Sequence, residues 1–153
     1  MLKALAAHNI HLHIISAGVL GIITQSIDLL RELEGIEELK NIVYIGTQEE
    51  YDKDEILVAF KEPIITSLNK SKLISHEILP HVPLNSNAIV IGDLIPDLLV
   101  TENLKLDTVL SVGFYHEEGS SPLENFKEQY DVLILNDGNL TWVANLIKGL
   151  NFN

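Results

Sequence analysis

Residues 88–97 read AIVIGDLIPD, an apolar run that ends in a glycine and carries two carboxylates four positions apart. The run predicts a buried strand over Ile89–Ile91 that ends in a turn at Gly92. In an open parallel sheet, ligands bind outside the carboxyl ends of the strands. The pattern therefore places Asp93 and Asp97 where a metal ion or a phosphate would be bound.

The rest of the chain alternates between helical and strand periodicity, which predicts an α/β fold with a mostly parallel sheet. The acidic stretch Gln48–Glu55 separates two short strands and predicts a small β excursion. After Lys70 we expect a weakly helical or irregular segment as far as Pro80 and Pro83, because proline is excluded from helix interiors. We expect one domain over residues 1–153. The expected helices are Leu2–Ala7, Gly21–Glu34, Leu123–Tyr130 and Leu140–Leu150, and the further expected strands are Ile10–Ser16, Asn41–Gly46, Ile56–Phe60, Thr108–Phe114 and Val132–Leu135.

The composition of the chain limits the chemistry and the partners that it can have. The 153 residues are 46% hydrophobic, which is enough for a core, and the absence of cysteine excludes disulfides and thiolate chemistry. A net charge of −12 argues against nucleic acid as a partner. The start of the chain has no signal-peptide pattern, and no apolar run is long enough to span a bilayer. We therefore expect a cytoplasmic protein that is not bound to a membrane.

Two further segments are candidates for chemistry. Ser16, Ala17 and Gly18 lie between an expected strand and an expected helix, where a hydroxyl and free backbone N–H groups can bind an anion. The alternative is an ordinary helix-capping serine. Lys70 could neutralise a phosphate, although surface lysines are far more common.

For Asp93 and Asp97, one interpretation is Mg²⁺ coordination through carboxylate oxygen. The other is a turn aspartate followed by a helix-capping aspartate, with Pro96 in the first helical turn. Asp52-Lys53-Asp54 also resembles a paired-aspartate motif, but its polar surroundings favour a solvated loop.

Taken in order, Ser16-Ala17-Gly18, Lys70 and Gly92-Asp93 with Asp97 resemble motifs II, III and IV of the haloacid-dehalogenase superfamily of phosphohydrolases. The likeness narrows to the cytosolic pyrimidine 5′-nucleotidase family, also called cytosolic 5′-nucleotidase III, and corresponds to the C-terminal half of that family. The stretches that carry it are Asn41-Ile42-Val43, Phe60-Lys61, Asn69-Lys70, residues 86–93, Val112-Gly113-Phe114, residues 130–135 and Val143-Ala144-Asn145.

The resemblance implies a three-layer Rossmann-like αβα core and removal of phosphate from nucleoside monophosphates through an aspartyl-phosphate intermediate, with Mg²⁺ as cofactor. It implies that Ser16, Ala17 and Gly18 bind phosphate, and that Lys70 contacts both the nucleophile and the phosphate. By the same resemblance, Asp93 and Asp97 belong to the metal site.

Motif I, DxDx[TV], which supplies the nucleophile in that superfamily, has no counterpart in this sequence, and most of the cap segment is likewise missing. We therefore expect the chain alone to be inactive or nearly so. The motif I strand lies between the strands of motifs II and IV in the superfamily, so its absence predicts a gap in the sheet or direct pairing of those two strands. Exposed edges would invite a complementing polypeptide or a second copy of the chain. The alternative function is a non-catalytic binding or interaction module of the same fold.

Overall fold

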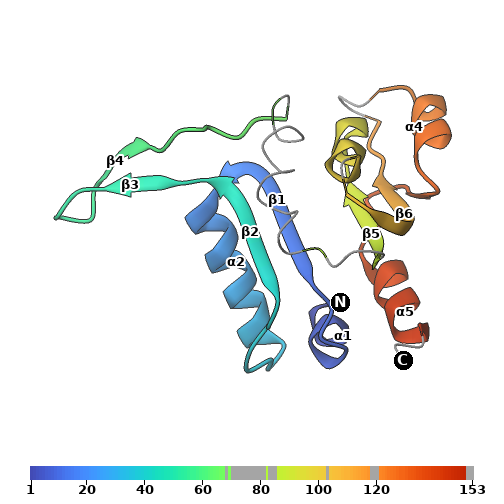
Figure 1. Ribbon diagram of the computed structural model, residues 1–153, viewed down its shortest axis with the longest axis horizontal. Coiled ribbons are helices and arrows are strands. Elements are labelled where there is room, and N and C mark those ends of the chain that lie inside the picture. The colour runs from blue at the N-terminus through green and yellow to red at the C-terminus, as the bar shows by residue number, and fades with distance from the viewer. Residues whose placement is uncertain (68, 70–81, 83–85, 103, 118–120, 151–153) are drawn as a thin grey trace. The chain divides into compact units, whose positions relative to one another are not determined.

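The computed structural model describes residues 1–67, 69, 82, 86–102, 104–117 and 121–150 (Figure 1). Each helix and strand expected from the sequence is present, with bounds shifted by a few residues. The elements are α1 (Leu2–Ala7), β1 (Leu12–Val19), α2 (Leu20–Leu33), β2 (Ile42–Thr47), β3 (Glu49–Tyr51), β4 (Leu57–Phe60), β5 (Ser86–Gly92), η2 (Ile95–Thr101), β6 (Leu106–Phe114), α4 (Leu123–Gln129), β7 (Val132–Ile134) and α5 (Thr141–Gly149).

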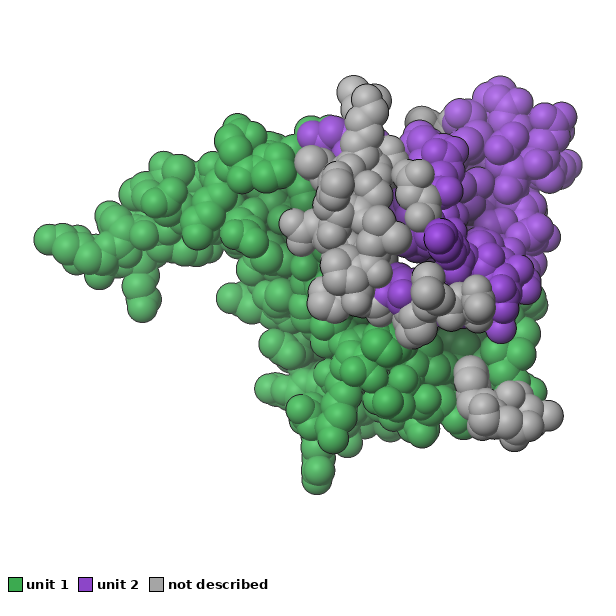
Figure 2. Space-filling model, viewed as in Figure 1, with its two compact units in different colours: residues 1–66, 140–153 green, residues 67–139 purple. Residues whose placement is uncertain are grey.

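The chain divides into two compact units, residues 1–66 with 140–153 and residues 67–139, which are coloured separately in Figure 2. The sequence predicts one partial domain over residues 1–153. The segment after Lys70, with its two prolines, lies outside the described residues.

In the first unit, β1 and β2 form a parallel pair, with Leu12 opposite Ile42. Helix α2 lies along this pair (Figure 1). Ile23 and Ile27 of this helix are partly buried, whereas Leu29 and Leu33 remain exposed. Helices α1 and α5 pack together, and Leu2 and Leu5 of α1 and Val143 and Ile147 of α5 are buried.

The acidic excursion differs from its prediction in one respect. We expect the hairpin to join the two apolar runs, but its first strand is β3, formed by the polar residues Glu49–Tyr51, which pairs antiparallel with β4. The turn is closed by Asp52, whose Oδ1 accepts hydrogen bonds from the backbone N–H groups of Asp54 and Ile56, both at 2.9 Å. The paired-aspartate sequence is thus an exposed hairpin turn, as its surroundings predict. Every residue of β4 is exposed.

The second unit contains a parallel sheet in the order β5-β6-β7. Its core includes Val90 from β5, Val112 from β6 and the aromatic residues Phe126 and Tyr130, all of which are buried. The two rings stack with centroids 5.6 Å apart. This core fixes the carboxyl end of β5, from which the Gly92–Asp97 loop emerges.

Strands β1 and β5 belong to separate sheets. Within the described residues, β1 pairs with β2 alone and β5 with β6 alone, so each keeps one edge without a partner strand. Within the same residues, no helix is long and apolar enough to cross a membrane.

Candidate active site

Asp97 holds the loop that carries Asp93. Strand β5 ends at Gly92, and η2 begins three residues later. The Asp97 carboxylate oxygen Oδ2 accepts hydrogen bonds from the backbone N–H groups of Asp93, at 3.1 Å, and of Leu94, at 3.2 Å. Asp97 is 6% exposed, whereas Asp93 is exposed. The contacts of Asp97 are therefore those expected of a capping residue. Of the two aspartates, Asp93 is the one whose side chain is accessible to a ligand.

Gly92 is required by this arrangement. A Cβ atom at this position would lie 2.5 Å from both the Cβ and the Oδ2 atoms of Asp97. Such a distance is far below van der Waals contact, so any side chain would displace the capping carboxylate. Because Gly92 has no side chain, Asp97 can pack closely against the backbone at the end of β5.

Tyr130 fixes the same loop from the side of α4. Its hydroxyl donates a 2.7 Å hydrogen bond to the carbonyl oxygen of Leu94. Burial raises the pKa of Tyr130 far above its ordinary value, and the negative charges of Asp97 and Asp93 add to the rise. The hydroxyl therefore stays protonated and keeps its donor role at neutral pH. Tyr130 was part of the family likeness, but its contact with Leu94 depends on tertiary packing and has no local signal.

Ser16 lies inside β1 and not at the helix cap. The residue that precedes α2 is Val19, which makes no side-chain capping bond, so the capping alternative for Ser16 does not describe the structure. The Ser16 Oγ atom accepts a 3.0 Å hydrogen bond from the Gly18 N–H. The register of β1 on β2 shifts between Ile15 and Val19, so Ser16 lies in an irregular part of the strand. Because Oγ is the acceptor in this bond, the hydroxyl proton is free to be donated to a ligand oxygen.

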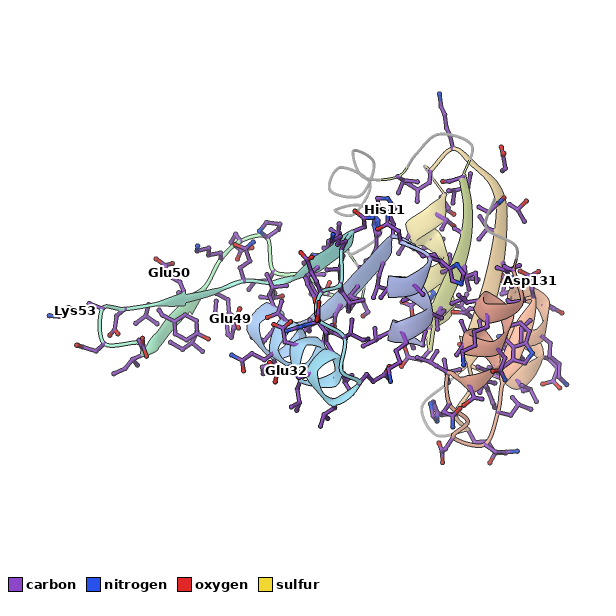
Figure 3. All side chains as sticks on the ribbon, turned by 90° about the horizontal axis from the view of Figure 1, so that it is seen from below. His11, Glu32, Glu49, Glu50, Lys53 and Asp131 are labelled. Atoms are coloured by element: carbon purple, nitrogen blue, oxygen red, sulfur yellow. The ribbon has the colours of Figure 1, made fainter. Side chains whose placement is uncertain are left out.

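The start of α2 holds a carboxylate that the sequence patterns do not indicate. Glu49, from β3, accepts the Gly21 N–H with both oxygens, at 2.9 Å to Oε1 and 3.2 Å to Oε2. Figure 3 labels Glu49 where the β3–β4 ribbon meets α2, with Glu50 and Lys53 farther out on the ribbon. Glu49 lies in a polar stretch predicted as an excursion, and no spacing rule connects it to Gly21.

The predicted site residues are distributed over the two units. Ser16, Ala17 and Gly18 belong to the first unit, and Asp93 and Asp97 to the second. Lys70 lies outside the described residues. Asp93 thus offers one exposed carboxylate after a parallel strand, a donor that suits Mg²⁺, which is usually held by one or two protein carboxylates together with phosphate and water. The described part of the chain contains no cluster of three or more histidine, aspartate or glutamate side chains placed to hold a metal ion.

Parallel strands, covering helices and an aspartate loop after β5 define a Rossmann-like α/β fold of the haloacid-dehalogenase type. The crystal structure of cytosolic 5′-nucleotidase IIIB bound to cytidine has this fold: it superposes with a TM-score of 0.68 at 16% identity, over 96% of this chain and 49% of that one. The pyrimidine 5′-nucleotidase (UMPH-1) family model matches residues 1–151, and the chain belongs to that family.

Curated relatives agree with this assignment. A Caenorhabditis elegans protein named for a cytosolic 5′-nucleotidase 3 is 29% identical over 160 residues, which cover 98% of this chain and 40% of the relative. The 7-methylguanosine phosphate-specific 5′-nucleotidase B of Xenopus laevis is 24% identical over 71% of this chain and 38% of its own length. The chain therefore spans about two fifths of the curated relatives that it matches.

Proposed function

We propose that this chain supplies the phosphate- and metal-binding part of a Mg²⁺-dependent 5′-nucleotidase that acts on nucleoside monophosphates, pyrimidine nucleotides in particular. Family membership supports the reaction class. The observation that carries the proposal is the position of Asp93, exposed after a parallel strand in a loop held by Asp97 and Tyr130. A cytoplasmic location belongs to the same proposal, since a matched relative is named as cytosolic.

Each residue has a separate task in this proposal. The Ser16 hydroxyl donates to a phosphoryl oxygen, next to the backbone of Ala17 and Gly18, and Lys70 neutralises phosphate charge. Asp93 would hold Mg²⁺, which when bound neutralises the phosphoryl oxygens. Asp97 is a positioning residue, because its Oδ2 atom fixes the backbone from which Asp93 projects.

The nucleophile is the part that this sequence does not contain, because no DxDx[TV] motif occurs in it. We propose that a polypeptide carrying this motif completes the site, and that the chain alone hydrolyses nucleotides at or near the background rate. The free edges of β1 and β5 support this, since each could accept a further strand. A second copy of the chain at these edges is the competing arrangement.

The test is phosphate release from CMP and UMP with Mg²⁺. We expect no turnover by the purified chain, and turnover when it is mixed with a separate polypeptide that carries a DxDx[TV] motif. An Asp93→Asn variant should abolish the restored activity, whereas Asp107→Asn, an exposed aspartate on β6, should leave it unchanged. Robust turnover by the purified chain would contradict the prediction that the chain alone is inactive. If no mixture releases phosphate, the proposal that a second polypeptide completes the site is contradicted.

A second candidate is a non-catalytic binding module of the same fold. It is favoured by a specific observation: the carboxylates of Asp97 and Glu49 already accept the backbone N–H groups next to the predicted metal and phosphate sites. Calorimetry with Mg²⁺, phosphate and CMP separates the candidates. Absence of metal binding together with a stable partner complex supports the module, and Mg²⁺-dependent binding of CMP supports the nucleotidase.

A further inference from the structure

The contact between Glu49 and Gly21 joins two elements that are far apart in sequence. Twenty-eight residues separate the pair, and both carboxylate oxygens lie within hydrogen-bond distance of one N–H group. Glu49 is partly buried, whereas its neighbour Glu50 is exposed. Because side chains alternate along a strand, these two glutamates lie on opposite faces of β3.

The backbone at the start of α2 is shaped for this carboxylate. A Cβ atom on Gly21 would lie 2.5 Å from Oε1 of Glu49, so a side chain at that position would force the carboxylate to shift from its present place. The helix has no acidic residue in its first turn, and Val19 provides no side-chain cap. Glu49 therefore supplies the negative charge that the positive end of the helix dipole favours.

The same N–H group lies three residues beyond Gly18, the end of the predicted phosphate-binding segment. A phosphate near that segment would meet two obstacles: the Gly21 N–H is already used, and a carboxylate lies beside it. Both the lost hydrogen bond and the repulsion between like charges reduce phosphate affinity.

We propose that Glu49 is a built-in anion that competes with phosphate at the start of α2 and so lowers the phosphate affinity of the Ser16–Gly18 segment. This inference rests on the proposed function, because it takes that segment to be the phosphate site. The β3–β4 ribbon then acts as an autoinhibitory arm, since phosphate gains the Gly21 N–H when Glu49 withdraws.

The experiment is a titration of the 153-residue chain with inorganic phosphate, followed through the backbone amide resonances of Ser16, Gly18 and Gly21. Glu49→Ala removes the competing group. Glu49→Gln removes its charge but keeps an oxygen that can accept the Gly21 N–H, so it guards against loss of structure. Glu50→Ala is the matched control, because it removes a charge from the neighbouring, outward-facing position on the same strand.

We expect the phosphate dissociation constant to fall about three- to tenfold in Glu49→Ala, and less in Glu49→Gln, with Glu50→Ala equal to the wild type. Before any phosphate is added, Glu49→Ala should also shift the Gly21 amide resonance and speed its hydrogen exchange. Equal phosphate affinity in the wild type and Glu49→Ala would overturn the competition while leaving the phosphate site intact. If no variant shows a phosphate-dependent shift at Ser16 or Gly18, both the competition and the phosphate-binding part of the proposed function fail.

Discussion

The Tyr130 hydroxyl donates a 2.7 Å hydrogen bond to the backbone carbonyl oxygen of Leu94, across a sequence separation of 36 residues. The bond connects the end of α4 with the loop that presents Asp93. The ring cannot easily turn away, because it is 5% exposed and stacks on Phe126. The loop is thus fixed from two directions, by Tyr130 at a carbonyl group and by Asp97 at two N–H groups.

Tyr130→Phe removes this bond while keeping the aromatic ring in place. We expect the free energy of unfolding to fall by about 1 kcal/mol or somewhat more, because the Leu94 carbonyl loses its donor. Urea denaturation measures the change. Tyr51→Phe is the control, since Tyr51 is 56% exposed in the β3–β4 ribbon. Equal unfolding midpoints for the two variants would contradict a structural role for the bond.

Gly92→Ala tests the close approach of β5 to Asp97. The added methyl group would overlap the carboxylate, so we expect a loss of about 1–3 kcal/mol in stability from the displaced loop. Gly149→Ala is a matched control, because a Cβ atom there meets no atom of the described residues within 4 Å and α5 ends at this residue. That variant should be neutral or slightly more stable. Thermal unfolding of both variants measures these changes in stability. If Gly92→Ala is as stable as the wild type, the loop can move aside for the added methyl group without cost.

Asp97→Ala and Asp93→Ala separate the positioning role from ligand binding. Asp97→Ala leaves two backbone N–H groups without their acceptor and should cost about 1–2 kcal/mol of stability. Asp93→Ala should change stability by less than about 0.5 kcal/mol, because the side chain is exposed. Added Mg²⁺ should raise the unfolding temperature of the wild type and leave that of Asp93→Ala unchanged. If Asp93→Ala is the less stable of the two variants, the assignment of the positioning role to Asp97 is contradicted.

The order of helices and strands could be predicted from sequence because most elements carry a strong periodic pattern. The helix predicted over Gly21–Glu34 is α2, and the run before Gly92 is β5. Strand β3 could not be predicted, since Glu49–Tyr51 is polar and short and becomes a strand by pairing with β4. The division into two units also has no signal in composition, because no linker-like segment marks it.

For the candidate site, the sequence indicates which types of residue to consider. It gives much less information about the contacts that these residues make. The capping alternative for Asp97 follows from its place after Pro96, and the structure confirms that contact. The contact of Glu49 with Gly21 depends on how the ribbon meets the helix, which no local pattern encodes. The role of Lys70 stays a prediction, because that residue lies outside the described part of the chain.

We expect Asp131 to make the stability of the second unit sensitive to acid. Its Oδ2 atom accepts hydrogen bonds from the Ser111 N–H, at 2.8 Å, and from the Ser111 hydroxyl, at 2.7 Å. These bonds hold the pKa of Asp131 below its ordinary value, the backbone bond contributing most. At a pH just below the ordinary value of about 4, the unfolded chain therefore binds a proton that the folded chain does not.

It follows that the stabilisation from Asp131 is fully present above about pH 4 and is lost as the pH falls through the lowered pKa. Asp131→Asn cannot ionise, so we expect its urea midpoint to decline less than that of the wild type between about pH 5 and pH 3. Asp107→Asn, which removes an exposed charge from β6, is the control for net charge. An unchanged acid dependence in Asp131→Asn would show that its bonds to Ser111 are not what makes the fold sensitive to acid.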